Sequence, residues 1–271
     1  MKIKLFLLVL FTTFINVSAA QIDTLMIKSE SMNKIIPNIV IIPDSYTTTS
    51  DRFNVVYLLH GAGGNHLNWL SKVPEIQEYA DLYNLIIVCP DGGKTSWYFD
   101  SPIDKKMKYE TYISKELVPT IDKLYNTLAA KNGRAITGLS MGGHGALYLA
   151  FKHQNVWAAA GSMSGGLDLL PFPNNWKIAD RLGNYNKHKK NWVENSVINM
   201  VYLLNEKGLK LIIDCGVSDF FYDVNHRFHK KLLKLNIPHD YTERPGKHDW
   251  NYWQNSIQYQ LLYFYNFFNE N

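Results

Sequence analysis

The residues with the clearest chemical potential lie in the motif GLSMG at 138–142. Its spacing matches G-x-S-x-G, in which a serine occupies a sharp turn between a strand and a helix with its hydroxyl exposed. An apolar run at 134–139 precedes the serine, and a helical pattern begins at Met141. The start of a helix also directs backbone N–H groups toward developing negative charge. The motif therefore indicates Ser140 as a nucleophile, with a structural Gly-Ser turn as the alternative.

A serine hydroxyl needs a base, and the base needs a carboxylate that orients it. In chains with this motif the residues follow in the order Ser, then Asp or Glu, then His. His248 lies in PGKHDW at 245–250, between the last predicted strand and the last predicted helix. Because such a loop lies at the edge of the sheet where Ser140 is expected, we predict that His248 is the base. His239 opens a strand and is expected to be structural.

Four acidic residues compete for the orienting role. Asp219 lies in the loop that leaves the penultimate predicted strand, at the edge expected for His248. Asp214 lies within that strand and should face a helix layer, whereas Asp249 adjoins His248 and is poorly placed to orient it. Asp219 is therefore the preferred carboxylate, and Asp223 is the second choice.

Acyl transfer develops an oxyanion, which two preorganised N–H donors can stabilise. The backbone of Met141 is expected to supply one donor. The loop HGAGG at 60–64 is expected to supply the other, from Ala62 as first choice or Gly63 as second, because glycines let a backbone approach the substrate closely. His60 is expected to brace this loop. The alternative is an ordinary glycine turn.

Short apolar runs alternate with helical patterns along the chain, which indicates a layered α/β domain with right-handed crossovers. Strands are predicted at 35–42, 54–60, 85–89, 134–139, 158–162, 210–215 and 239–244. Helices are predicted at 109–125, 141–152, 193–205, 224–235 and 250–268. Several strands are apolar throughout, as in parallel sheets covered on both faces. The aperiodic stretch 165–191 is either a wall of a substrate pocket or a mere connection.

The first 20 residues have the pattern of a signal peptide, with Lys2 and Lys4 before an apolar run and small residues at the end. We therefore expect residues 1–20 to be removed and residues 21–271 to form one domain, exported to the periplasm or secreted and not attached to a membrane after cleavage. A retained anchor or a buried element is the alternative. Export permits disulfides, but Cys89 and Cys215 end strands that are not expected to be neighbours, so both are predicted to be free thiols.

The charge balance argues against a nucleic-acid partner. The chain has 28 basic and 24 acidic residues, a net charge of +4, and the basic residues are dispersed. His226 and His229 are compatible with a metal pair, but no third ligand is evident, so no metal site is predicted.

Five segments of the sequence, taken together, make the chain similar to the esterase D-like branch of the α/β-hydrolases. The matching segments are LLHGAGGNHLNW (58–69), SWYFDSP (96–102), ITGLSMGGHGAL (136–147), DCGVSD (214–219) and PGKHDWNYW (245–253). The resemblance implies an α/β-hydrolase fold with a mostly parallel central sheet, helices on both faces and no large cap domain. It also implies a Ser140, Asp219 and His248 triad and an oxyanion hole at Met141 and Ala62, with no cofactor.

The resemblance further implies a serine carboxylesterase. Export favours acetyl or feruloyl esters of plant polysaccharide as substrates, although fold does not fix substrate. The alternatives are a thioesterase resembling S-formylglutathione hydrolase, an acyltransferase resembling the mycolyltransferases, and an inactive carbohydrate-binding module. Trp97 is predicted to contact substrate, and Lys247 stands where relatives often have glycine, which leaves substrate preference open. The oligomeric state is not predicted.

Overall fold

The computed structural model describes residues 20–204 and 208–270. The predicted signal segment at 1–20 therefore lies, apart from Ala20, outside the described residues. Among the described residues, no helix is both long and apolar enough to cross a lipid bilayer.

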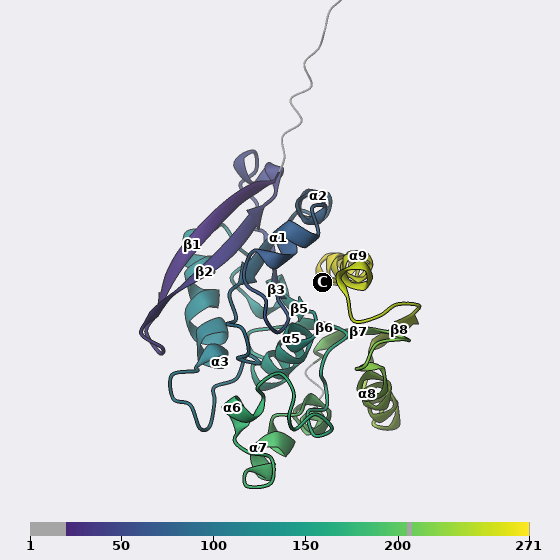
Figure 1. Ribbon diagram of the computed structural model, residues 1–271. Coiled ribbons are helices and arrows are strands. Elements are labelled where there is room, and N and C mark those ends of the chain that lie inside the picture. Colours follow the sequence, from purple (N-terminus) through teal and green to yellow (C-terminus); the bar gives the residue numbers. More distant parts are fainter. Residues whose placement is uncertain (1–19, 205–207, 271) are drawn as a thin grey trace, which may run out of the picture.

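An eight-stranded mixed sheet forms the centre of the molecule (Figure 1). Its strands are β1 (Gln21–Ser29), β2 (Lys34–Ile42), β3 (Asn54–Leu59), β4 (Leu85–Pro90), β5 (Arg134–Gly138), β6 (Ala159–Met163), β7 (Lys210–Gly216) and β8 (Asp240–Arg244). They lie in the order β1-β2-β4-β3-β5-β6-β7-β8. The first two strands pair antiparallel with their neighbours, and the pairs from β4 to β8 are parallel. The predicted α/β-hydrolase architecture is confirmed.

Helices cover both faces of this sheet. They are α1 (Asn68–Lys72), α2 (Ile76–Leu82), α3 (Tyr109–Thr111), α4 (Val118–Leu124), α5 (Met141–Lys152), α6 (Ala179–Leu182), α7 (Lys189–Glu194), α8 (Tyr222–Lys234) and α9 (Trp250–Asn269). One buried cluster joins the sheet to α4, α5 and α8, and a second joins it to α1, α2 and α9. Alternate residues of β3 enter the two clusters, as the period of a strand requires.

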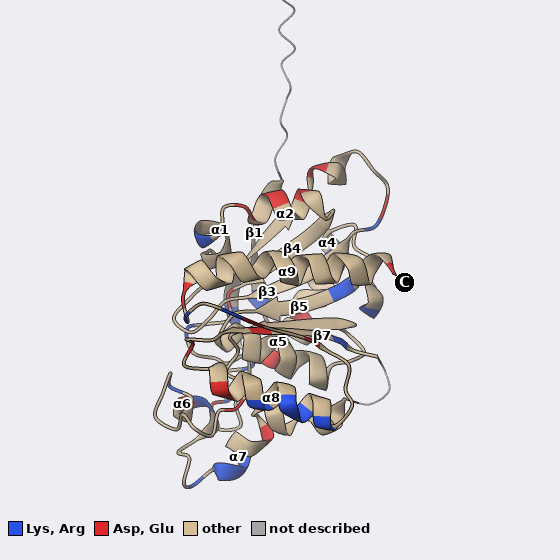
Figure 2. Cartoon of the chain, turned by 90° about the vertical axis from the view of Figure 1, so that its right-hand side faces the viewer, with Lys and Arg blue, Asp and Glu red and all other residues tan. Residues whose placement is uncertain are grey.

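The helix α9 is unusual because it carries no charged side chain along its 20 residues. Figure 2 shows it as a continuous uncharged rod across the sheet, whereas α8 below it carries several basic side chains. Its inner side supplies Ile257, Leu261 and Phe264 to the core, each fully buried. This packing holds the start of α9, and with it the preceding loop, against the sheet.

Two predicted helices differ in the structure. The prediction at 193–205 is wrong for the described residues up to 204, because α7 ends at Glu194 and two short 3-10 turns, η4 (Val197–Asn199) and η5 (Val201–Leu203), follow. Asn205 lies outside the described residues. The hydroxyl of Ser196 donates to the carbonyl of Trp192, and the Asn199 amide donates to the carbonyl of Val193. Side chains of this kind compete with helical hydrogen bonds.

The helix predicted at 109–125 is divided by a π-helical stretch, η2 (Tyr112–Leu117). Pro119, in the first turn of the following α4, has no backbone N–H and interrupts the regular ladder.

Both cysteines are free and buried, as predicted. Cys89 ends β4 and Cys215 lies in β7, with β3, β5 and β6 between those strands. Burial raises the pKa of both thiols above the ordinary value.

Candidate active site

The backbone at Ser140 adopts the turn expected from its motif. Ser140 has φ 55° and ψ −116°, outside the usual regions for a residue with a side chain. Its N–H donates to the carbonyl of Met163 at 2.9 Å, which fixes the turn between β5 and α5. A Cβ on Gly142 would lie 2.5 Å from the carbonyl oxygen of Leu59, so this position requires glycine for α5 to begin against β3. Strain of this kind is typical of functional turns.

Three side chains meet at the edge of the sheet that carries Ser140, and a continuous series of hydrogen bonds joins them. The Nε2 atom of His248 lies 2.9 Å from Oγ of Ser140. The Nδ1 atom lies 3.0 and 2.8 Å from the two carboxylate oxygens of Asp219. With Nδ1 protonated toward the carboxylate, Nε2 is left as the acceptor for the serine hydroxyl. The structure thus brings together the three residues that the sequence proposed as a triad, although they lie up to 108 positions apart.

The carboxylate of Asp219 is shielded from water and further fixed by the backbone. Its side chain has no exposed area, and Oδ1 also accepts the N–H of Phe221 at 2.7 Å. A dry carboxylate held by several donors can orient the imidazole and stabilise its cation.

The competing acids have other surroundings. Asp214 is buried, where it accepts hydrogen bonds from Ser256 and Gln260 at 2.6 and 2.8 Å. Burial raises the pKa of Asp214 above its ordinary value. Asp249 caps the start of α9 by accepting the N–H of Tyr252, and Asp223 is exposed in the first turn of α8.

The loop at 60–64 faces Ser140, and Ala62 lines the same pocket. At the first position of α5 the N–H of Met141 has no acceptor within its helix. No hydrogen bond from the N–H of Ala62 is found within residues 20–204 and 208–270. Both groups predicted as oxyanion donors are therefore available to a ligand.

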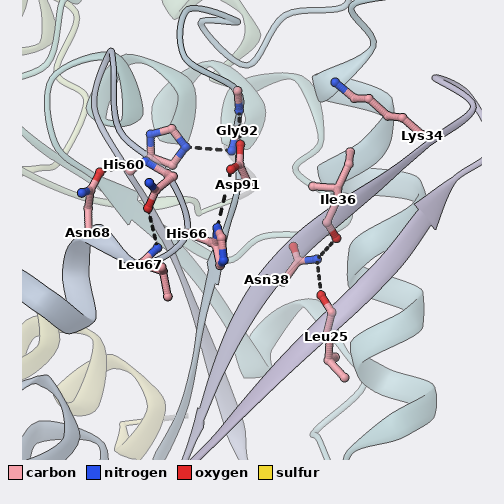
Figure 3. Close-up of polar contacts among 12 residues, drawn as sticks. Leu25, Lys34, Ile36, Asn38, His60, His66, Leu67, Asn68, Asp91 and Gly92 are labelled. Atoms are coloured by element: carbon pink, nitrogen blue, oxygen red, sulfur yellow. Dashed lines mark hydrogen bonds and ion pairs between the residues drawn. The ribbon is translucent and has the colours of Figure 1, made fainter.

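His60 ties this loop to the end of β4 (Figure 3). Its Nδ1 donates to the carbonyl of Gly61 at 2.8 Å, while Nε2 accepts the N–H of Gly92 at 2.8 Å. Burial lowers the pKa of His60, which matches a neutral ring with one donor and one acceptor nitrogen. The hydroxyl of Tyr98 donates to the carbonyl of His60 at 3.0 Å. His60 has the bracing contacts that the sequence suggested.

Further along the loop, His66 lies beside Asp91, with 3.6 Å between Nδ1 and the nearer carboxylate oxygen (Figure 3). The loop that carries Ala62 is therefore attached at both ends to the segment that follows β4.

A pocket of about 320 Å³ opens over Ser140 and His248. Its remaining lining consists of Gly61, Ala62, Gly63, Gly64, Asn68, Leu139, Trp176, Phe220, Trp250 and Trp253. The lining thus combines a glycine-rich loop with several aromatic side chains. A second cavity, of about 400 Å³, lies at the start of β7 near Leu235 and Ile237. Ser140, Asp219 and His248 are not among the residues that line it.

The expectation that Trp97 contacts substrate is not met by its position. Trp97 is only 1% exposed and lies outside the pocket lining. Its ring packs against His144, and its Nε1 donates to the carbonyl of Trp176 at 3.4 Å. Trp97 therefore supports a pocket residue, Trp176, that the sequence argument did not single out. Phe220 is a second pocket residue that the sequence analysis does not predict. Its position directly after Asp219 was the available signal.

The two helical histidines do not converge on a common ligand position. His226 lies 2.8 Å from a carboxylate oxygen of Glu243, and His229 lies 2.8 Å from His239. Across the described part of the chain, no group of three or more His, Cys, Asp or Glu side chains is arranged to hold a metal ion.

Comparison with known proteins gives a consistent assignment for residues 29–264, which match the family model described as "Putative esterase". An esterase of Mycobacterium tuberculosis is 29% identical over 235 residues, covering 77% of this chain and 51% of that protein. The chain thus spans about half the length of that relative. An acetyl esterase of Caldicellulosiruptor saccharolyticus is 28% identical over 222 residues, covering 77% of this chain and 82% of that protein.

Solved structures agree on the fold. A ferulic acid esterase superposes with a TM-score of 0.78 at 26% identity, covering 92% of this chain and 99% of the other. The S-formylglutathione hydrolase of Staphylococcus aureus has a TM-score of 0.79 at 22% identity, covering 92% and 100%, and shows the shared fold alone.

Proposed function

Because this chain belongs to the esterase family of serine carboxylic ester hydrolases, we propose that it is an exported carboxylesterase that uses Ser140, His248 and Asp219. Its substrates are acetyl or feruloyl esters of plant polysaccharide. The observation that carries the proposal is the unbroken hydrogen-bond series from Asp219 through His248 to Ser140, open to a pocket.

The geometry supports a two-step reaction. Oγ of Ser140 attacks the ester carbonyl carbon while Nε2 of His248 takes the hydroxyl proton. The carbonyl oxygen becomes an oxyanion between the N–H groups of Met141 and Ala62, and each such donor is worth about 10²–10³ in kcat. The imidazolium then gives its proton to the alcohol oxygen, the C–O bond breaks, and an acyl-serine remains.

Water completes the cycle. His248 takes a proton from a water molecule, the resulting oxygen attacks the acyl carbon, and Ser140 leaves with the returned proton. Asp219 keeps its negative charge throughout and stabilises the imidazolium in both steps. No redox change occurs, and the net reaction is ester plus water to acid plus alcohol.

The substrate class rests on two supports. An acetyl esterase and a ferulic acid esterase are among the chain's relatives and structural neighbours. The leader-like sequence at 1–20 supports export to a compartment where polysaccharide is available.

A panel of esters tests the proposal. Acetylated xylan, a feruloylated arabinoxylan fragment and S-formylglutathione are incubated separately with the protein and with Ser140→Ala, and the released acid is quantified. We expect acetate or ferulate release that falls about 10⁴–10⁶-fold in the variant. Preference for the thioester would overturn the assignment. So would transfer of the acyl group in place of hydrolysis when a sugar acceptor is added to the same assay.

A further inference from the structure

The alcohol part of the ester must lie beside His248, which restricts the residues it can meet. In the first step the leaving oxygen receives its proton from Nε2, so it lies within hydrogen-bond reach of that atom. Three aromatic rings pack on the imidazole, those of Phe220, Phe221 and Trp253, with centroids 4.1, 5.3 and 4.9 Å away. Phe221 and Trp253 are buried, whereas Phe220 is 52% exposed. Of the three rings, Phe220 is thus the most accessible to an incoming alcohol.

Trp176 extends this surface. Its ring stacks on Phe220 with centroids 5.5 Å apart and planes inclined by 21°. Both residues line the pocket, so the stacked pair forms part of its aromatic lining. Trp176 comes from the segment 165–191, whereas Phe220 follows β7, so two separate parts of the chain build the pair.

The position of Trp176 is strongly constrained. Trp176 and Lys177 both have left-handed backbones, with φ 45° and 54°, which costs of order 1 kcal/mol or more for each non-glycine residue. The Trp97 indole holds the Trp176 carbonyl, and the rings of Phe172 and Phe221 pack against its side chain at 5.4 and 5.0 Å. A strained, over-determined residue at a pocket wall points to a binding role.

We propose that Trp176 and Phe220 form the platform for the alcohol part of the substrate, and that this alcohol is a pyranose ring. The inference rests on the proposed function. A sugar ring offers an apolar C–H face to the aromatic pair and leaves its hydroxyl edge in water at the open rim. The pocket, at about 320 Å³, lies near the lower end of the range for ligand sites, which suits one sugar ring with a short acyl group.

The test varies the alcohol while the acyl group stays constant. Ethyl acetate, phenyl acetate and a monoacetylated methyl β-D-xylopyranoside give the same acetyl-enzyme but differ in leaving-group reactivity. The alcohol contact is therefore reported by the ratio of a variant's kcat/KM to that of the unaltered enzyme, compared among the three esters. For Trp176→Ala we expect kcat/KM for the xylopyranoside to fall about tenfold more than that for ethyl acetate, the scale of one lost ring contact. Trp176→Phe, which keeps a ring, should recover part of this selectivity.

Tyr202→Ala is the matched control, because Tyr202 is an aromatic residue 77% exposed and outside the pocket lining. It should change no ratio. Equal losses on all three acetates from Trp176→Ala, or no loss on any, would overturn the platform. A selective loss on phenyl acetate with none on the sugar ester would also overturn it, in favour of an aryl alcohol.

A second measurement uses the unaltered enzyme, in case Trp176→Ala does not fold. Methyl β-D-xylopyranoside should inhibit 4-nitrophenyl acetate hydrolysis competitively, and more strongly than an acyclic polyol such as xylitol. Equal weak inhibition by both compounds would contradict the proposal. Failure of the proposed function would look different, because acetate hydrolysis would then be absent or would persist in Ser140→Ala.

Discussion

The backbones of Gly216 and Gly246 lie against each other where the last two strands end. A Cβ on Gly216 would be 2.5 Å from the carbonyl oxygen of Gly246, and the same oxygen accepts the N–H of Ser218 at 2.9 Å. The loop that carries Asp219 therefore runs in direct contact with the loop that carries His248. The hydrogen bond between acid and base depends on this close backbone approach.

Separating these two loops should uncouple the acid from the base. Gly216→Ala forces the backbones apart, and we expect kcat/KM to fall about 100-fold, the scale of a misplacement of about 1 Å. Overpacking should also lower the free energy of unfolding by about 1–3 kcal/mol. Steady-state kinetics and urea unfolding measure the two effects. Val217→Ala, a change at an adjacent and 47% exposed side chain, serves as the control, and equal activity of the two variants would refute the coupling.

The choice of carboxylate can be tested with two isosteric changes. Asp219→Asn should reduce kcat by about 10⁴-fold, because the amide can favour the wrong tautomer of His248. Asp223→Asn, a change at an exposed residue in the first turn of α8, should leave kcat near that of the unaltered enzyme. A larger loss of kcat from Asp223→Asn than from Asp219→Asn would show that Asp223 orients His248.

His60 should matter for catalysis although it is outside hydrogen-bond contact with the triad. His60→Ala releases the loop of Ala62 from Gly92, and we expect kcat to fall by about 10–100-fold through a displaced oxyanion donor. Tyr98→Phe removes only the hydroxyl that holds the His60 carbonyl and should give a smaller loss of the same kind. His226→Ala, on α8, is the control. An unchanged kcat in a folded His60→Ala protein would exclude the bracing role.

Lowering the pH should destabilise the fold through another buried histidine, His144. This residue is fully buried in α5, and burial lowers its pKa to about 4. Between pH 6.5 and about 4 the unfolded chain binds a proton there that the folded protein does not, so stability falls as pH decreases. The linkage amounts to about 3 kcal/mol for a shift of this size.

The comparison of His144→Leu with the unaltered protein isolates that contribution. Urea unfolding at pH 7, 6, 5 and 4.5 should give a free energy of unfolding that declines less steeply in the variant. Parallel declines in the two proteins would show that His144 does not contribute.

Glu110 should affect stability only at lower pH. Burial alone would raise its pKa, but hydrogen bonds from His153 and Lys152 lower the pKa to about 2.

Much of the architecture could be predicted because the relevant strands are buried on both faces. The runs at β3 and β4 are continuous apolar segments, and the helix α5 begins and ends where its pattern does. The edge strand β1 was not predicted. Its sequence, QIDTLMIKS, is mostly exposed, and its strand conformation depends on antiparallel pairing with β2 over nine residues. Pairing of this kind leaves little trace in local composition.

The triad residues could be located because each follows a strand of one parallel sheet, and such residues converge at one edge. The pocket wall could not be located in this way. Trp176 lies in an irregular segment, where its position is set by contacts with Trp97 and Phe221 that come from distant parts of the chain. The prediction for Trp97 rests on its place after a predicted strand that ends near the expected site, but its ring is packed in the core.

Covalent labelling of the nucleophile tests the central claim most directly. An aryl phosphonate ester is added in slight excess, residual esterase activity is followed over time, and the protein is then digested and mapped by mass spectrometry. We predict one adduct, on Ser140, that forms in proportion to lost activity and is absent from Ser140→Ala. An adduct on a different residue, or full activity retained with Ser140 modified, would contradict the account.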